Sequence, residues 1–106
     1  MATGRLGTAD LAAATNTTVY TVPASTFTVA TVSIVNRSAA TVTIRLAVAS
    51  AATPSNAEYL EFEVSLASKG VLERTGIVMD AGKLLVVRSS AVDVNAVVYG
   101  IETTTV

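Results

Sequence analysis

Cysteine and histidine are both absent from this chain of 106 residues. Their absence excludes a disulfide scaffold, metal sites built on Cys or His, and catalytic dyads or triads that use a thiolate or an imidazole. Charge is also scarce, because charged residues make up 14% of the chain and the formal net charge is −1. So weakly charged a surface cannot steer nucleic acid or an anionic membrane towards it. We therefore expect no nucleic-acid partner, no membrane partner, no metal and no cofactor.

Long hydrophobic runs are missing as well. No apolar run approaches the roughly 20 residues that a membrane helix needs, and the first residues lack the apolar stretch of a signal peptide. The length fits one domain, since a second core would leave each half too small to be stable. A chain without cysteine agrees with assembly in a reducing cytoplasm.

Aromatic residues make up only 5% of the chain, although 51% of it is hydrophobic. The core must therefore be built from small and β-branched side chains, mainly Ala and Val. A chain that is both apolar and weakly charged has little to oppose association. This composition favours burial against neighbouring subunits; the alternative is an ordinary domain that is rich in Ala.

From Thr17 onward, apolar and polar residues alternate with the period of a β-strand. Seven strands are expected, over residues 17–22, 27–35, 41–48, 59–66, 71–75, 83–89 and 94–103. Turn signals every 8–12 residues or so are typical of an antiparallel β-sandwich, either jelly-roll or Ig-like, with a small closed barrel as the alternative. The chain then divides into an N-terminal arm over residues 1–16, extended or lightly helical, and a sandwich domain over residues 17–106.

The alternation also predicts which side chains face inward. Two strands should bury one face each, formed by Val42, Ile44, Leu46 and Val48 in one and by Leu60, Phe62, Val64 and Leu66 in the other. Within residues 27–35 the apolar phase changes, from Phe27 and Val29 to Val32 and Ile34. A β-bulge near Ala30 and Thr31 would explain that change.

Few side chains could carry chemistry. Glu61 and Glu63 are two residues apart on one strand, a spacing that allows paired carboxylates for acid–base work or for calcium. No cleft or ligand-rich loop accompanies them, so a solvated face balanced by Arg45, Arg74 or Arg88 is the favoured interpretation. Without a histidine, only Lys69 or Lys83 could activate a hydroxyl nucleophile, and both lie at turns where lysine stays solvated. We expect no catalytic residue.

Turn residues and tyrosines have simple interpretations too. Asp80, Asp93 and Asn95 could supply oxygens to calcium, but these residue types are favoured at turns, and we take them as turn residues. Tyr20, Tyr59 and Tyr99 are expected at the edge of the core with the hydroxyl in water. The alternative is a sugar-stacking platform, in which Tyr59, Tyr99 and the loops bind a surface polysaccharide of a host.

Several segments together resemble a known group of proteins. They are Val19-Tyr20-Thr21-Val22-Pro23-Ala24, Val32-Ser33-Ile34-Val35-Asn36-Arg37-Ser38, Thr43-Ile44-Arg45-Leu46-Ala47-Val48, Gly76-Ile77-Val78-Met79-Asp80-Ala81-Gly82-Lys83-Leu84 and Val98-Tyr99-Gly100-Ile101-Glu102. This layout resembles small virion structural proteins of tailed bacteriophages, including those of cyanobacteria. Ser25 stands where glycine is usual in that group, and Lys83 where an acidic residue is usual. The resemblance implies a non-enzymatic β-sandwich present in many copies on the head or tail of a virion, and it transfers no catalytic or binding residue.

The resulting hypothesis is a capsid decoration (cement) protein; the alternatives are a tail, baseplate or fibre-attachment subunit and, in another class, a glycan-binding module. Its partners would be itself, as a homo-oligomer for which a trimer is attractive, and phage capsid or tail proteins. The contact residues are expected in the arm and in the last strand: Leu6, Leu11, Val97, Tyr99 and Ile101. The arm could add to the edge of a neighbour's sheet, so deletion of residues 1–16 should leave the sandwich folded.

Overall fold

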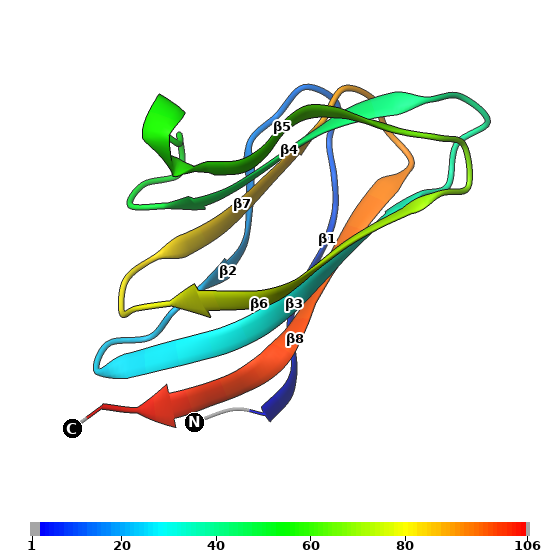
Figure 1. Cartoon of the computed structure of the whole chain (residues 1–106). Coiled ribbons are helices and arrows are strands. Elements are labelled where there is room, and N and C mark those ends of the chain that lie inside the picture. Colours follow the sequence, from blue (N-terminus) through cyan, green and yellow to red (C-terminus); the bar gives the residue numbers. More distant parts are fainter. Residues whose placement is uncertain (1–2, 106) are drawn as a thin grey trace.

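The computed structural model describes residues 3–105, which form eight β-strands and one short 3-10 turn (Figure 1). The strands, in chain order, are β1 (Thr3–Asp10), β2 (Thr17–Thr21), β3 (Thr26–Asn36), β4 (Val42–Ala49), β5 (Tyr59–Leu66), β6 (Val71–Met79), β7 (Leu84–Ser89) and β8 (Val94–Thr104). The 3-10 turn η1 (Asn56–Glu58) precedes β5. The expected strands are all present, and one further strand comes before them.

The strands form two antiparallel sheets that pack as a sandwich (Figure 1). Sheet A has the order β1-β8-β3-β6, and sheet B has the order β2-β7-β4-β5. The prediction of an all-β sandwich is therefore confirmed. In this arrangement successive strands alternate between the sheets except at β4–β5, which is the strand order of a two-sheet jelly roll.

The N-terminal segment is the extra strand, and the prediction of an arm over residues 1–16 is wrong for the described part of that segment. Thr3–Asp10 pair with β8 through seven matched residues, with one register shift between Arg5 and Gly7. A Cβ atom on Gly7 would lie 2.2 Å from the carbonyl oxygen of Val19, so glycine allows β1 to approach β2 closely.

Residues 11–14 then cross from sheet A to sheet B and close one end of the sandwich. The amide of Leu11 donates to the carbonyl of Val94 at 2.8 Å, and the amide of Ala14 donates to the carbonyl of Ser89 at 2.8 Å. The Leu11 side chain is buried in the core, with 2% of its surface exposed. This segment therefore belongs to the sandwich domain.

Strand β3 keeps strict alternation over its whole length, so the predicted phase change does not occur. Its even-numbered residues from Thr26 to Asn36 are buried, and Phe27 and Val29 point to the outside. A bulge does lie opposite the expected position, but its extra residue belongs to β6: Ala30 pairs with Ile77 and Val32 pairs with Arg74. Gly76, in the left-handed region at φ 67°, accommodates it.

Sheet B also departs from simple alternation near its edge. Phe62, expected in the core, is 54% exposed. Its strand is irregular, because Glu63 adopts a positive φ of 54° and the β4–β5 register shifts on both sides of Leu46. On β4, Val42, Ile44 and Leu46 are buried as expected, whereas Val48 is only half-buried, at the margin of the core.

Candidate protein-interaction surface

The outer surface of sheet A carries the largest group of exposed apolar side chains that share one face. Val78 of β6, Val29 of β3 and Ile101 of β8 stand in one row, because Val29 pairs with both of the others. The exposed fraction is 68% at Val78, 41% at Val29 and 54% at Ile101. Phe27 and Tyr99 lie beside this row and are also exposed. We call these five residues the outer A face; such patches mark interaction sites in soluble proteins.

Three of the predicted contact residues lie on the outward side of β8. Tyr99 and Ile101 belong to the outer A face, and Val97 is half-buried on the same side. Leu6 is half-buried on β1 and packs against the core. Leu11 is fully inside the sandwich, so the interpretation of that residue as a contact residue is wrong.

Phe27, Val29 and Val78 were missed by the sequence analysis. The signal was present in Phe27 and Val29, which alternate in the opposite phase to Val32 and Ile34. A bulge does not cause that difference: Thr26 and Thr28 occupy the buried inward positions at the start of β3, so Phe27 and Val29 face outward.

Two charged side chains flank the outer A face at its opposite edges. Arg5 is exposed on β1, in the row of Tyr99. Glu73 is exposed on β6 and accepts a hydrogen bond of 3.0 Å from the Tyr99 hydroxyl. This hydrogen bond, with a smaller contribution from desolvation, raises the pKa of Tyr99. Among residues 3–105, neither Arg5 nor Glu73 forms an ion pair.

A second tyrosine–glutamate pair lies inside the sandwich and connects the two sheets. The Tyr20 hydroxyl of β2 is hydrogen-bonded to Glu102 of β8 and, at 2.8 Å, to Thr28 of β3. Burial, followed by the hydrogen bond to Glu102, raises the pKa of Tyr20 to about 12. Tyr20 is 7% exposed, so the expectation that its hydroxyl is in water is wrong. The pair is enclosed by protein and forms part of the core.

The carboxylates of Glu61 and Glu63 point to different partners. Glu61 of sheet B forms an ion pair with Arg74 of sheet A at 2.5 Å, across the side of the sandwich where β5 and β6 are the edge strands. Glu63 forms an ion pair with Arg45 at 3.0 Å on the outside of sheet B, and this contact lowers the pKa of Glu63. Both have arginine partners, as the interpretation of a balanced, solvated face required.

At one end of the sandwich, polar groups tie the turns together. Asn36 is fully buried, and its side-chain amide donates to the carbonyls of Ala40, Leu66 and Ala67. Its carbonyl oxygen accepts from the amide and hydroxyl of Ser38. Asn36 thus joins the β3–β4 turn to the β5–β6 turn, which explains why a polar residue is buried here.

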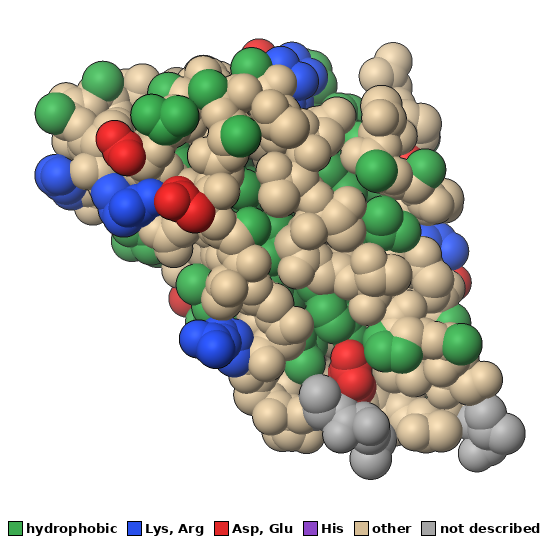
Figure 2. Space-filling view, turned by 180° about the vertical axis from the view of Figure 1, so that it is seen from behind, with side chains coloured by type: hydrophobic (Ala, Val, Ile, Leu, Met, Phe, Trp, Pro, Cys, Tyr) green, Lys and Arg blue, Asp and Glu red, His purple; other side chains and the backbone are tan. Residues whose placement is uncertain are grey.

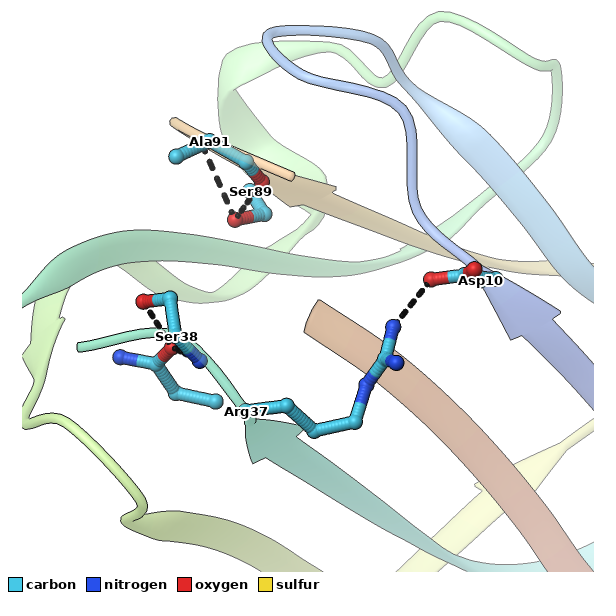
Figure 3. Close-up of polar contacts among 6 residues, drawn as sticks. Asp10, Arg37, Ser38, Ser89 and Ala91 are labelled. Atoms are coloured by element: carbon cyan, nitrogen blue, oxygen red, sulfur yellow. Dashed lines mark hydrogen bonds and ion pairs between the residues drawn. The ribbon is translucent and has the colours of Figure 1, made fainter. Parts of the chain in front are cut away.

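The same end includes the β1 and β7 termini (Figure 3). Arg37 forms an ion pair of 2.6 Å with Asp10, and its amide donates to the carbonyl of Asp93. The Ser89 hydroxyl donates to the carbonyl of Ala91 at 2.9 Å and accepts from the Ala91 amide. These contacts satisfy turn backbone locally, and we assign them a structural role.

The acidic turn residues have the geometry of turns. Asp93 adopts a positive φ of 65° between β7 and β8, and Asp80 forms an ion pair with Lys83, three residues later, at 3.2 Å. The Lys83 contact lowers the pKa of Asp80. Among residues 3–105, no three Asp or Glu side chains gather as a metal site would require.

A shallow depression of about 340 Å³ lies on sheet B beside η1, lined by Asn56, Tyr59 and Phe62. The Tyr59 and Phe62 rings meet edge to face at 4.9 Å, and the Arg45 guanidinium lies 4.5 Å from the centre of the Phe62 ring. Tyr99 is on sheet A, so Tyr59 and Tyr99 do not form the single platform considered from the sequence.

Figure 2 shows the side of the molecule formed by the edge strands β1 and β2. Hydrophobic side chains are visible along the middle of this side, and charged groups gather towards one end (Figure 2). In the part of the chain that the structure describes, no helix has the length and apolar character needed to cross a membrane.

When the chain is compared with known protein families, with curated proteins and with solved structures, no match is found.

Proposed function

We propose that the chain is a non-enzymatic structural subunit of a tailed-phage virion, and specifically a capsid decoration protein. The observation that carries this proposal is the outer A face, where a row of apolar side chains crosses three neighbouring strands and none of the described residues forms a layer over it. A subunit of an assembly that is held together by protein contacts, either to sister copies or to other proteins, needs such a surface.

Two further observations support this role. The sequence segments that resemble phage virion proteins include parts of β2, β3, β4, β6 and β8 and the β6–β7 turn, so both sheets contain some of them. The jelly-roll strand order is also found in viral capsid proteins, as it is in lectins.

Cryo-electron microscopy of virions from the phage that encodes the chain tests this proposal. We expect repeated density for the jelly roll on the outside of the capsid shell. Density confined to the tail, baseplate or fibres would favour the alternative structural role. A virion that lacks the protein at all of these positions, confirmed by mass spectrometry of purified particles, would overturn the proposal.

Glycan binding is a second candidate, favoured by the depression beside η1. Exposed aromatic rings beside a side-chain amide are a combination that binds sugars, because the ring packs on the apolar face of the sugar and the amide bonds its hydroxyls. A glycan array probed with the intact protein and with Phe62→Ala tests this candidate. Binding that is lost in Phe62→Ala would support it, and no binding by either protein would reject it.

A further inference from the structure

The geometry points to a second copy of this chain as the occupant of the outer A face, stacked face to face around a twofold axis that runs parallel to the strands between β3 and β8. This inference concerns the face on which the proposed function rests. It adds the identity of the partner and the symmetry of the contact, and it is tested on the purified chain without any particle.

The strand order of sheet A makes its outer surface self-complementary. Two strands lie on each side of the proposed axis, so rotation places β8 over β3 of the second copy and β1 over β6 of the second copy. Val29 and Ile101 are direct cross-strand partners and hence lie at the same height along the axis. Each would therefore pack on the other in the second copy, and the centre of the contact would be apolar on both sides.

The flanking charges select this axis. Arg5 is on β1 and Glu73 is on β6, at opposite edges of the sheet. Because the rotation places β1 over β6, each Arg5 comes to the edge that carries Glu73 of the second copy, and the contact is made twice. A twofold axis that crossed the strands would place β1 over β1 and leave the two charges at separate edges.

The axial positions of the two side chains are compatible with an ion pair. Arg5 is in the row of Tyr99, whereas Glu73 is in the row of Ser33 and Val97, two residues along β8. Two residues of strand correspond to roughly 7 Å, and packed sheets lie about 10 Å apart. An extended arginine and glutamate together can span that separation. Within one chain, Tyr99 already directs the Glu73 carboxylate towards β8 through its 3.0 Å hydrogen bond.

The available area is sufficient for a stable contact. Four strands about 4.8 Å apart, with 8, 11, 11 and 9 residues in sheet order, give a face of roughly 19 Å by 33 Å, or about 600 Å² on each copy. Specific complexes bury about 800 Å² per partner, and the lower end of their range is near 600 Å². A stacked pair therefore reaches the lower end of the range for specific association.

Charge exchange at the two edges provides the sharpest test. Analytical ultracentrifugation of the intact chain from about 10 µM to 1 mM should show a monomer–dimer equilibrium. Arg5→Glu and Glu73→Arg should each raise the dissociation constant by about tenfold or more, because like charges then meet twice. The double variant R5E/E73R should return it to within about threefold of the original value, since the pairs re-form with reversed signs.

Apolar variants test the centre of the contact. Val78→Asp and Ile101→Asp should abolish the dimer, whereas Val92→Asp, at a comparably exposed valine in the β7–β8 turn, should leave it unchanged. Circular dichroism melts identify any variant that fails to fold. If one of the two aspartate variants does not fold, the other still tests the face.

A chain that stays monomeric at 1 mM, or a dimer unaffected by both the charge and the apolar variants, would overturn the inference. Failure of the double variant to restore association would exclude this axis. A dimer that is absent from virions would instead count against the proposed function alone.

Discussion

Two tyrosine–glutamate pairs, one inside the sandwich and one on the outside of sheet A, place the same chemical groups in opposite surroundings. Tyr20 and Glu102 are buried and connect the two sheets, whereas Tyr99 and Glu73 are exposed and connect β8 to β6 across β3. The pKa of the tyrosine is raised in both pairs. The largest cause is burial at Tyr20 and the hydrogen bond to Glu73 at Tyr99. The inner pair therefore contributes to folding, and the outer pair is available to position a charge at an interface.

The same contrast applies to the apolar residues of β3. Ile34 and Val32 are completely buried, whereas Phe27 and Val29 on the same strand are 37% and 41% exposed. All four are residues that favour strands, so residue type alone does not separate them. The difference is that one face of the strand packs on sheet B, whereas among residues 3–105 no second layer covers the other face.

The largest expected effect on stability comes from deleting the N-terminal segment, which contributes both to the core and to the edge of sheet A. Deletion of residues 1–16 removes β1, which covers one edge of β8, and Leu11, which is in the core. We expect a chain without a cooperative thermal transition, as followed by circular dichroism. A truncated protein that melts cooperatively near the temperature of the full chain would restore the interpretation of this segment as an arm.

Paired alanine variants on β3 measure the contrast between its two faces. Ile34→Ala should lower the free energy of unfolding by about 2–5 kcal/mol, because it leaves a cavity in a closed core. Val29→Ala should change it by less than about 0.5 kcal/mol at low protein concentration, where no dimer contributes. Urea denaturation of both variants gives the two values. Equal losses would mean that the outer face is as well packed as the core.

The tyrosine pairs can be compared by removing single hydroxyl groups. Tyr20→Phe should destabilise the fold by about 1–3 kcal/mol, because buried Glu102 and Thr28 each lose a hydrogen-bond partner. Tyr99→Phe should have an effect below about 0.5 kcal/mol, since water replaces its exposed hydroxyl. Thermal melts of the two variants at neutral pH compare these losses. A larger loss of stability in Tyr99→Phe than in Tyr20→Phe would contradict the structure.

A final effect, confined to alkaline solution, concerns the inner pair. The pKa of Tyr20 rises from 10.0 to about 12 on folding, so the folded state retains a proton that the unfolded state releases. Its contribution to stability is complete below pH 10 and is lost as the pH rises through 12. In Tyr20→Phe this part of the alkaline loss should disappear. Denaturant midpoints measured from pH 9 to about 12 would show the difference, and parallel curves for both proteins would refute it.

The sequence predicted the second to eighth strands well, because seven segments have a strand-like period and end at clear turn signals. It failed at β1, where Gly4 and Gly7 hide the pattern, and at Phe62, where a bulge reverses the side of the strand. The candidate site was predicted in part: Tyr99 and Ile101 were named, but Phe27, Val29 and Val78 were not. Strands that are apolar on both faces do not reveal which face is covered.

By itself, the sequence determined that this protein is built from β-strands and has no thiol or imidazole chemistry, because alternation and composition are local properties of the chain. The tertiary structure decided that β1 completes sheet A, that Tyr20 is inside, and that Val78, Val29 and Ile101 form one outward row. Those features depend on pairing between segments far apart in the sequence, such as residue 29 with residues 78 and 101. A register shift of one residue would move every side chain of a strand to the other face, so the pairing with neighbouring strands decides which side chains stand in one row.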